Sequence, residues 1–505
     1  MKIHPAFVEP DVCQTSIELL REHCISALDP MKKMGVTSLA FADHQDFPQA
    51  LESRKTAVTD VILFGGFLLR FLESGLWPDH HYRLWVVSTA VRDILVRLCG
   101  IPAKHIGLIP RYGILPAAEH PRRLPEIQHD PTALVFGGRI SAVKNIECLL
   151  RTVSSLQIDH NCPVSLSLLG AFDDQYHSDY GRRAHNGYEE YLHSLVHALP
   201  WSRQPAFLQK MGREEWIKAA GDEPVLINLS SFMMEDFDVS LAQAQAAGWP
   251  AIISDWGGHR DAGGMNVMKI SPQLIAHSHE PPGVQELKAK ALASRLISRS
   301  FSFSSTLSGA ALSEVPVPIH ARELDHFRRE FLQRTGPDAH LIYRESNECF
   351  ADSPCGLRFF RSYRSLFSGL PPADETVVLI NDLHDANLPE LRHLRSLCLE
   401  ILRLASLAKR SIVFLPIQNL DEVHHRMTFL QAQSVIVPFV EDGILPFLES
   451  WLISEPKASV RILFNSAQGK SSVETVTTIL RAQDSLITYD DDLSNITRAA
   501  AGALA

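Results

Sequence analysis

Residues 134–145 read LVFGGRISAVKN, and this stretch decides the fold. An apolar, β-branched run leads into Gly137 and Gly138, after which Arg139 and Lys144 flank a turn that opens a helix. A strand, a glycine turn and a helix start make one repeat of a parallel α/β sheet. Glycines let a ligand approach the backbone, and helix N-termini, arginine and lysine attract anions. The stretch indicates a diphosphate site; the alternative is a surface turn with two solvated basic side chains.

A second segment, residues 230–261, extends this pattern as SSFMMEDFDVSLAQAQAAGWPAIISDWGGHRD. An apolar strand over 225–229 precedes it, and an acidic loop at Glu235 leads into a helix over about 239–247, which a glycine and a proline end. A buried strand over 251–254 follows and finishes in another glycine turn. The two segments therefore predict neighbouring strands whose loops share one edge of a sheet.

The order of these pieces resembles the nucleotide-sugar-binding half of retaining glycosyltransferases with the GT-B fold, over roughly residues 85–261. The resemblance implies that Arg139 and Lys144 hold the donor diphosphate and stabilise the leaving nucleotide. It also implies that Glu235, the first Glu of the family's E-x7-E motif, lies against the donor sugar. The same resemblance gives a set of donor-binding residues: Gly138, Gly170, Phe237, Asp238 and Gln243.

Two residues depart from the family pattern. Gln243 stands where the motif has its second Glu, which accepts hydrogen bonds from the ribose hydroxyls. An amide has one acceptor oxygen, whereas a carboxylate has two charged ones, so we expect nucleotide binding to be weaker by about 1 kcal/mol. Asp238 stands where the family usually has Gly, so a carboxylate replaces bare backbone beside the sugar.

His44 is a further candidate catalytic residue. It follows the apolar strand in SLAFADHQDF, at the carboxyl end of a parallel sheet, where open α/β folds bind ligands. The family has a His at a similar strand end, against the donor sugar. The alternative is an ordinary histidine that caps a strand.

Composition sets the broad class of the protein. The chain has 505 residues, 45% of them hydrophobic and 21% charged, which predicts two or three globular α/β domains. A net charge of −10 argues against nucleic acid as the main partner. Eight cysteines without a CxxC pair favour reduced thiols in a cytoplasmic protein, and the polar start MKIHPAFVEPDV does not read as a signal peptide.

Alternating strand and helix signals divide the chain into three regions. The resemblance implies a pair of Rossmann-like domains, a shortened acceptor-side domain over 1–115 and a nucleotide-sugar domain over 116–300. After a Ser-rich linker that ends in VPVP, residues 320–505 form an additional α/β domain of no recognised family. Strands are predicted in the three regions at 38–42 and 84–87; at 133–136, 164–169, 225–229 and 251–254; and at 376–380, 411–415, 434–437 and 460–464.

The first region is shorter than the family's acceptor domain, and no Gly-rich loop precedes Ser38. Three explanations stay open: the domain is trimmed, the start lies downstream of the true one, or the C-terminal region supplies part of that half. The choice of acceptor would be made in this region.

Two functions follow from these observations. The first is a glycosyltransferase that moves a sugar with retention from a nucleotide-diphosphate sugar to a glycan or lipid-linked acceptor, without a metal or other cofactor. Such an acceptor leaves peripheral association with the inner face of the membrane open. The second is a degenerate protein that binds a sugar nucleotide or a partner without turnover. Arg139, Lys144 and Glu235 favour the first, whereas Asp238 and Gln243 favour the second.

Overall fold

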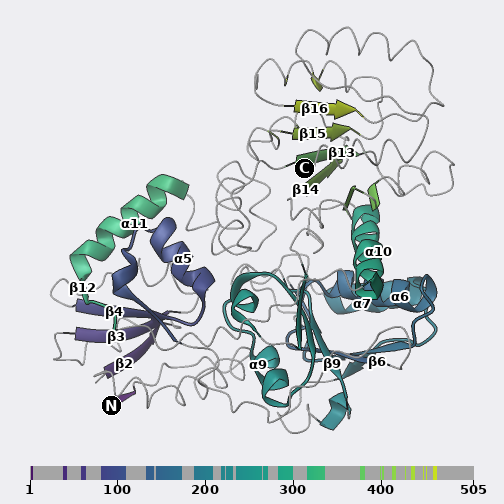
Figure 1. Cartoon of the computed structure of the whole chain (residues 1–505), viewed down its shortest axis with the longest axis horizontal. Helices are drawn as coiled ribbons and strands as arrows, with labels where there is room; N and C mark the ends of the chain where they lie inside the picture. Colours follow the sequence, from purple (N-terminus) through teal and green to yellow (C-terminus); the bar gives the residue numbers. More distant parts are fainter. Residues whose placement is uncertain are drawn as a thin grey trace.

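The computed structural model describes part of the chain, and the structural statements below concern that part. The described residues are 2–3, 38–42, 58–63, 81–109, 132–141, 144–172, 187–208, 218–221, 223–230, 235–263, 266–270, 282–298, 315–335, 376–380, 398–399, 401–402, 412–416, 423, 427, 434–437, 447–448, 451 and 459–462. Three sheets lie in them, and all their strand pairs are parallel except one short pair in the first sheet (Figure 1). The predicted α/β class is therefore confirmed.

The first sheet pairs its strands in chain order, all in parallel. Helix α5 (Thr89–Arg97) and the 3₁₀ helix η2 (Ala103–His105) join the last two strands, and the Ser88 hydroxyl caps α5 by accepting from Val91 N. This is the strand–helix–strand unit expected there. The strands are β1 (Lys2–Ile3), β2 (Ser38–Ala42), β3 (Val58–Leu63), β4 (His81–Val86) and β5 (Ile106–Leu108).

The chain returns to this first sheet after it has built the second. Strand β12 (Ile319–His320) pairs antiparallel with the start of β4, and α11 (Ala321–Thr335) follows it (Figure 1). Val317 holds the chain just before β12 against η2, because its N–H donates to Lys104 O at 2.8 Å and its carbonyl lies 2.8 Å from His105 Nδ1. Residues placed at the start of the expected third domain thus complete the first unit.

The second sheet has the strand order β11-β10-β9-β6-β7-β8 and is parallel throughout. Numbered along the chain, this is the doubly wound order of a dinucleotide-binding fold, whose direction reverses between β6 and β9. The four predicted strands of this region are confirmed to within a residue, whereas β8 and β11 were not predicted. The strands are β6 (Thr132–Gly137), β7 (Val164–Leu169), β8 (Ala206–Leu208), β9 (Val225–Asn228), β10 (Ala251–Ser254) and β11 (Val267–Ile270).

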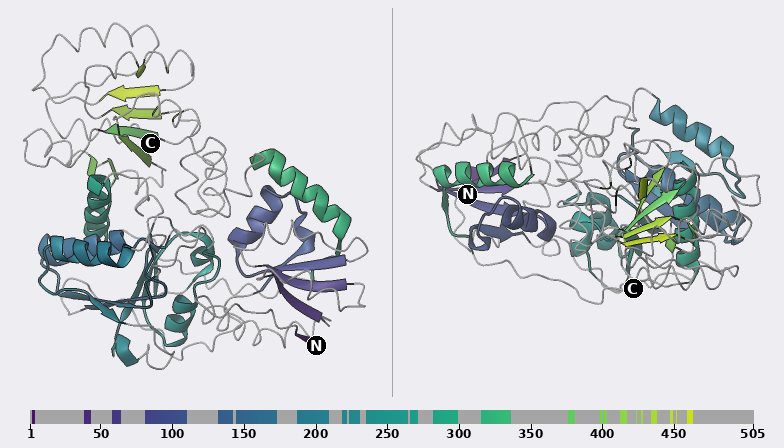
Figure 2. Two further views of the ribbon diagram at one scale, coloured as in Figure 1. Left: turned by 180° about the vertical axis from the view of Figure 1, so that it is seen from behind. Right: turned by 90° about the horizontal axis from the view of Figure 1, so that it is seen from above.

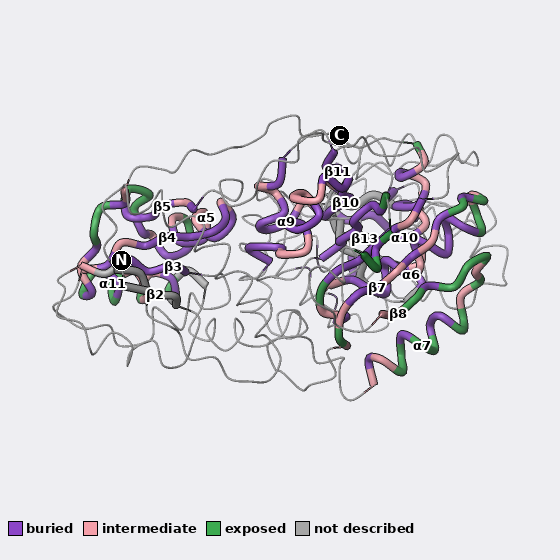
Figure 3. The backbone as a smooth tube through the Cα atoms, turned by 90° about the horizontal axis from the view of Figure 1, so that it is seen from below, coloured by how far each residue is buried: buried purple, intermediate pink, exposed green. Residues whose placement is uncertain are grey.

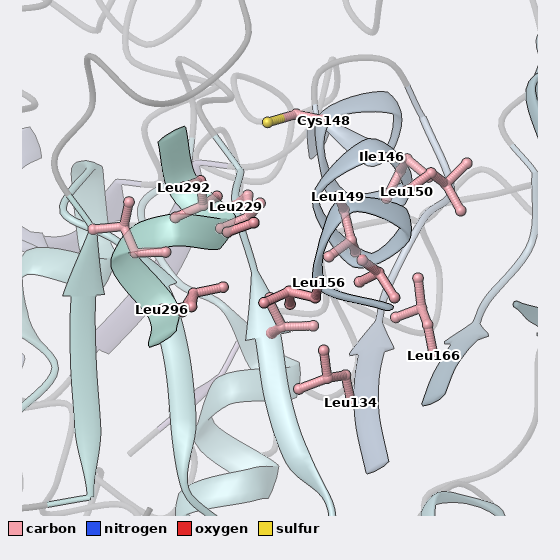
Figure 4. Packing of buried hydrophobic residues seen from close by; sticks show 14 of the residues in the cluster. Leu134, Ile146, Cys148, Leu149, Leu150, Leu156, Leu166, Leu229, Leu292 and Leu296 are labelled. Carbon is pink, nitrogen blue, oxygen red and sulfur yellow. The ribbon is translucent and has the colours of Figure 1, made fainter. Parts of the chain in front are cut away.

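Helices cover the second sheet and bury its core. Leu149 and Leu156 of α6 (Ile146–Ile158) pack with Leu134 and Leu166 of the strands and with Leu292 of α10 (Pro282–Ser298) (Figure 4). The strands are mostly buried except the edge strand β8, while α7 (Tyr188–Ala198) alternates between buried and exposed residues (Figure 3). Continuous apolar strands are typical of parallel sheets covered on both faces.

The third sheet has the parallel order β14-β13-β15-β16. It adjoins the second unit beyond α10 (Figure 2), and Ile436 and Cys398 belong to the same buried cluster as Leu292 of that helix. Its strands match the predicted ones to within a residue or two: β13 (Thr376–Ile380), β14 (Ile412–Pro416), β15 (Ser434–Val437) and β16 (Ser459–Ile462). None of the helices in the described residues is long and apolar enough to span a membrane.

A polar contact joins the first and second units. The 3₁₀ turn η6 (Gly257–Asp261) packs against α5, and the Asp261 carboxylate accepts from the Thr89 backbone N–H at 2.7 Å and from the Thr89 hydroxyl. A carboxylate at a helix N-terminus is favourable because the first N–H groups have no intrahelical partner. Asp261 therefore fixes α5 against the turn that follows β10.

We expect Asp261→Ala to loosen this contact. The substitution removes the acceptor for both Thr89 donors, so the free energy of unfolding in urea should fall by about 1 to 2 kcal/mol. Small-angle scattering should report a larger radius of gyration. Asp261→Asn keeps one acceptor oxygen and should give an intermediate result; an Asp261→Ala protein identical to the parent in both measurements would contradict the assignment.

Candidate functional site

The predicted donor-site residues gather where the second sheet reverses its strand order. Strands β6 and β9 are neighbours there, with Leu134 opposite Val225, and their carboxyl ends open into the loops that carry Lys144 and Glu235. Doubly wound folds bind ligands in the crevice outside the carboxyl ends at this reversal. Topology thus brings together two segments that lie 91 residues apart in the chain.

Two glycines bring the loops after β6 and β7 into contact. Gly138 has a φ of 133°, which side-chain-bearing residues rarely adopt, and its N–H donates to Leu169 O at 3.0 Å. A Cβ on Gly170 would lie 1.7 Å from Gly138 O. Backbone packing therefore accounts for Gly170, and its donor-binding role stays a prediction.

The N-terminus of α6 lies beside the basic residues. Asn145, its N-cap, has left-handed backbone with φ of 55° and makes no side-chain cap. Its amide instead donates to Leu229 O at 2.7 Å, which joins the start of α6 to the end of β9. Arg139 is half-buried in the preceding loop. The N-terminus of α6 thus lies beside Lys144, and helix N-termini attract anions.

Lys144 and Glu235 form an ion pair at the centre of this site. The Lys144 ammonium donates to Glu235 Oε2, and their side chains are 12% and 5% exposed. Burial alone would raise the pKa of Glu235, but Lys144 and the nearby His259 hold that pKa below its ordinary value. Glu235 is therefore an ionised acceptor, suited to sugar hydroxyls.

The Glu235 loop rests on the turn after β10. Gly258 N donates to Glu235 O at 2.6 Å, and a Cβ on Gly258 would lie 1.8 Å from Asp236 O. The sequence predicts that backbone comes close to the glycine pair that follows β10. The segment that does so is the acidic loop of the same unit.

Asp238 faces the protein. It is the N-cap of α9 (Val239–Ala246), where Oδ1 accepts from Ser240 N at 2.9 Å and Leu241 N at 3.2 Å. Its Oδ2 accepts from Asn228 Nδ2 at 2.8 Å and pairs with His259 Nε2 at 3.0 Å. The aspartate that departs from the family's Gly thus closes the N-terminus of α9 with its own carboxylate.

This capping arrangement also sets the charge of Asp238. Burial alone would raise its pKa, but His259, Lys144 and Ser240 hold the pKa well below its ordinary value. The Ser240 hydroxyl also reaches Gly137 O at 2.8 Å, so the cap joins α9 to the end of β6. The donor-binding role that the resemblance implies for Asp238 stays a prediction beside this structural one.

Of the remaining predicted residues, Phe237 lies just before α9 and Gln243 lies within it. Phe237 and Gln243 are both buried, at 8% and 7% exposure. The donor-binding roles of both residues stay predictions. His44 lies outside the described residues. Sequence reasoning missed His259, Asn145 and Asn228, since an N-cap and its supports are made by residues far apart in the chain.

Comparison with known proteins gives likeness in fold only. No family model matches the chain, and no curated protein matches it significantly. The pneumococcal O-GlcNAc transferase GtfA, solved with UDP and GlcNAc, is 12% identical with a TM-score of 0.36, over 61% of this chain and 56% of that one. This chain therefore spans little more than half of that transferase.

Two further solved structures show the same level of likeness. Anabaena HepE, solved with UDP-glucose, is 14% identical with a TM-score of 0.32, over 61% of this chain and 81% of that one. WaaG, a glycosyltransferase involved in lipopolysaccharide biosynthesis, is 13% identical with a TM-score of 0.27, over 66% and 75%. Likeness at this level does not establish a shared activity.

We expect Asp238→Ala to destabilise the protein strongly. The change removes a helix cap and leaves the buried Asn228 and His259 donors without their acceptor, so the free energy of unfolding should fall by about 3 kcal/mol or more. The exposed Glu190 of α7 offers a matched control, and Glu190→Ala should change that free energy by less than about 0.5 kcal/mol.

The effect should also depend on pH. Because the pKa of Asp238 is lowered on folding, the stabilisation is present above the ordinary aspartate pKa and is lost as pH falls toward the folded-state value. The difference between Asp238→Ala and the parent should therefore shrink between neutral pH and about pH 3. A difference that stays constant over this range would contradict an ionised Asp238.

Proposed function

We propose that the chain binds a nucleotide-diphosphate sugar where β6 and β9 end, and transfers the sugar with retention to a glycan or lipid-linked acceptor. One observation carries the proposal: Lys144 and Glu235, which the resemblance assigns to the diphosphate and the sugar, lie in direct buried contact. The sequence separates them widely, and only the expected topology brings them together.

The diphosphate would lie against Lys144, Arg139 and the first turn of α6. Two cations and a helix N-terminus neutralise the charge that grows on a departing diphosphate, and in a dry site such stabilisation contributes several kcal/mol. No resident metal or cofactor enters this scheme. A donor phosphate would take over part of the coordination of Lys144, leaving the Glu235 carboxylate to accept sugar hydroxyls.

A second function, binding without turnover, is favoured by Asp238. The first N–H groups of α9 donate to the Asp238 carboxylate and are therefore occupied, whereas the family leaves bare backbone beside the sugar. A donor would then be held by its diphosphate, with fewer contacts to the sugar. Turnover assays with UDP-, GDP- and ADP-sugars separate this function from transfer, because binding without release of nucleotide supports the second function alone.

We expect Lys144→Ala to lose donor binding while keeping the fold. Removing the ammonium deletes the charge that faces the diphosphate, and affinity for the nucleoside diphosphate should fall at least about a hundredfold by calorimetry. Lys218, an exposed lysine of the same unit, provides the matched control, and Lys218→Ala should bind as the parent does. Absence of binding by the parent to every nucleoside diphosphate and nucleotide sugar would refute the proposal.

We expect Gln243→Glu to strengthen nucleotide binding. The carboxylate restores two charged acceptors for the ribose hydroxyls, so the dissociation constant should fall about fivefold, equivalent to about 1 kcal/mol. The matched 2′,3′-dideoxy nucleotide should show no gain. An equal gain for both nucleotides would place Gln243 away from the ribose.

A further inference from the structure

His259 is a fully buried histidine whose two ring nitrogens both have partners. Its Nδ1 lies 2.9 Å from Ser254 Oγ and its Nε2 lies 3.0 Å from Asp238 Oδ2, and the side chain is 0% exposed. His259 is not among the residues assigned above to donor binding. Its position in η6 nevertheless places it in contact with Asp238 of the loop that carries Glu235.

The hydrogen-bond partners determine which ring nitrogens donate. The Ser254 hydroxyl donates its one proton to Ser230 O at 2.5 Å, so toward His259 it can only accept. Asp238 is an ionised carboxylate and also only accepts. With this hydroxyl orientation both ring nitrogens of His259 donate, Nδ1 to Ser254 Oγ and Nε2 to Asp238 Oδ2.

The turn holds the acidic loop at two points. Gly258 N donates to Glu235 O, and the adjacent His259 donates to Asp238 three residues further along the loop. Asp238 in turn fixes the first turn of α9. The segment between Glu235 and Asp238 is thereby set against β10 and its turn.

The charged groups around His259 come from each element near it. The acidic loop supplies three buried carboxylic side chains, Glu235, Asp236 and Asp238, and the start of α6 supplies Lys144. Uncharged Ser254 faces the ring from β10. The turn itself carries Arg260 and Asp261, and α5, which packs on the turn, carries Arg92 and Asp93.

We propose that His259 is a positioning residue, a buried ring that donates from both nitrogens and holds Asp238 and the Glu235 loop beside Lys144, so that donor binding weakens when the ring no longer donates to Asp238. The part of this proposal that concerns the donor rests on the proposed function. The protonation and the hold on the loop do not, and they are tested without any ligand.

The first experiment measures the ring. Nitrogen NMR of the full chain labelled in histidine, with the His259 signals assigned by their loss in His259→Gln, should show two protonated ring nitrogens at neutral pH. Ser254→Ala removes the acceptor of Nδ1 but keeps the bond to Asp238, so the Nδ1 signal should change while the Nε2 signal stays as in the parent. An unprotonated ring nitrogen in the parent at neutral pH overturns the proposal.

The second experiment measures the loop. Hydrogen exchange of peptides that contain the Ser240 and Leu241 amides should be at least about tenfold faster in His259→Gln than in the parent, because the substitution removes the ring that donates to Asp238. His193→Gln changes a half-exposed histidine of α7 and should leave exchange of the Ser240 and Leu241 amides unchanged. Equal protection in His259→Gln and the parent overturns the positioning role.

The third experiment uses UDP, GDP and ADP as probes. For whichever the parent binds, the dissociation constant should rise at least about tenfold in His259→Gln, while His193→Gln should bind as the parent does. Equal affinity in His259→Gln and the parent overturns the proposal. Where the parent binds none of the probes, the proposed function fails, while ring protonation and exchange still decide the role of His259.

Discussion

Parallel pairing of β6 with β9 is the constraint on which the site depends. The strand order reverses there, so the loops that leave the two strands diverge to opposite sides and leave room between them. Two side chains, one from each loop, donate hydrogen bonds to backbone carbonyls across this junction: the Asn145 amide to Leu229 O and the Ser240 hydroxyl to Gly137 O. The position of every proposed donor residue in the second unit follows from that pairing.

Buried charge in the site is arranged as two compensating pairs. Breaking a buried ion pair is costly because it leaves one charge without its counter-ion, although the pair as a whole often adds little stability over apolar packing. The two pairs are therefore better explained by the positions in which they hold side chains than by the stability they add to the fold. They are Lys144 with Glu235 and Asp238 with His259. The first pair presents a cation and an acceptor side by side, and the second pair fixes the loop that carries that acceptor.

Much of the second unit could be predicted from sequence, because its strands are continuous apolar runs between glycine turns. The short edge strand β8 has only three residues, and β11 contains Lys269, so neither gives a clear signal. The contact of Lys144 with Glu235 joins two segments that the sequence places 91 residues apart. The role of Asp238 could not be read in advance, because it depends on His259, 21 residues away. Strand β12 was missed since two residues carry no periodicity.

The return of the chain to the first sheet determines how the two units can move. The polypeptide passes from the first unit to the second after β5 and comes back before β12, so two covalent connections join the same pair of bodies. A single tether would let one body swivel freely about the other. Two connections limit such rotation more than one would, and the contact between Thr89 and Asp261 ties the two units together between them.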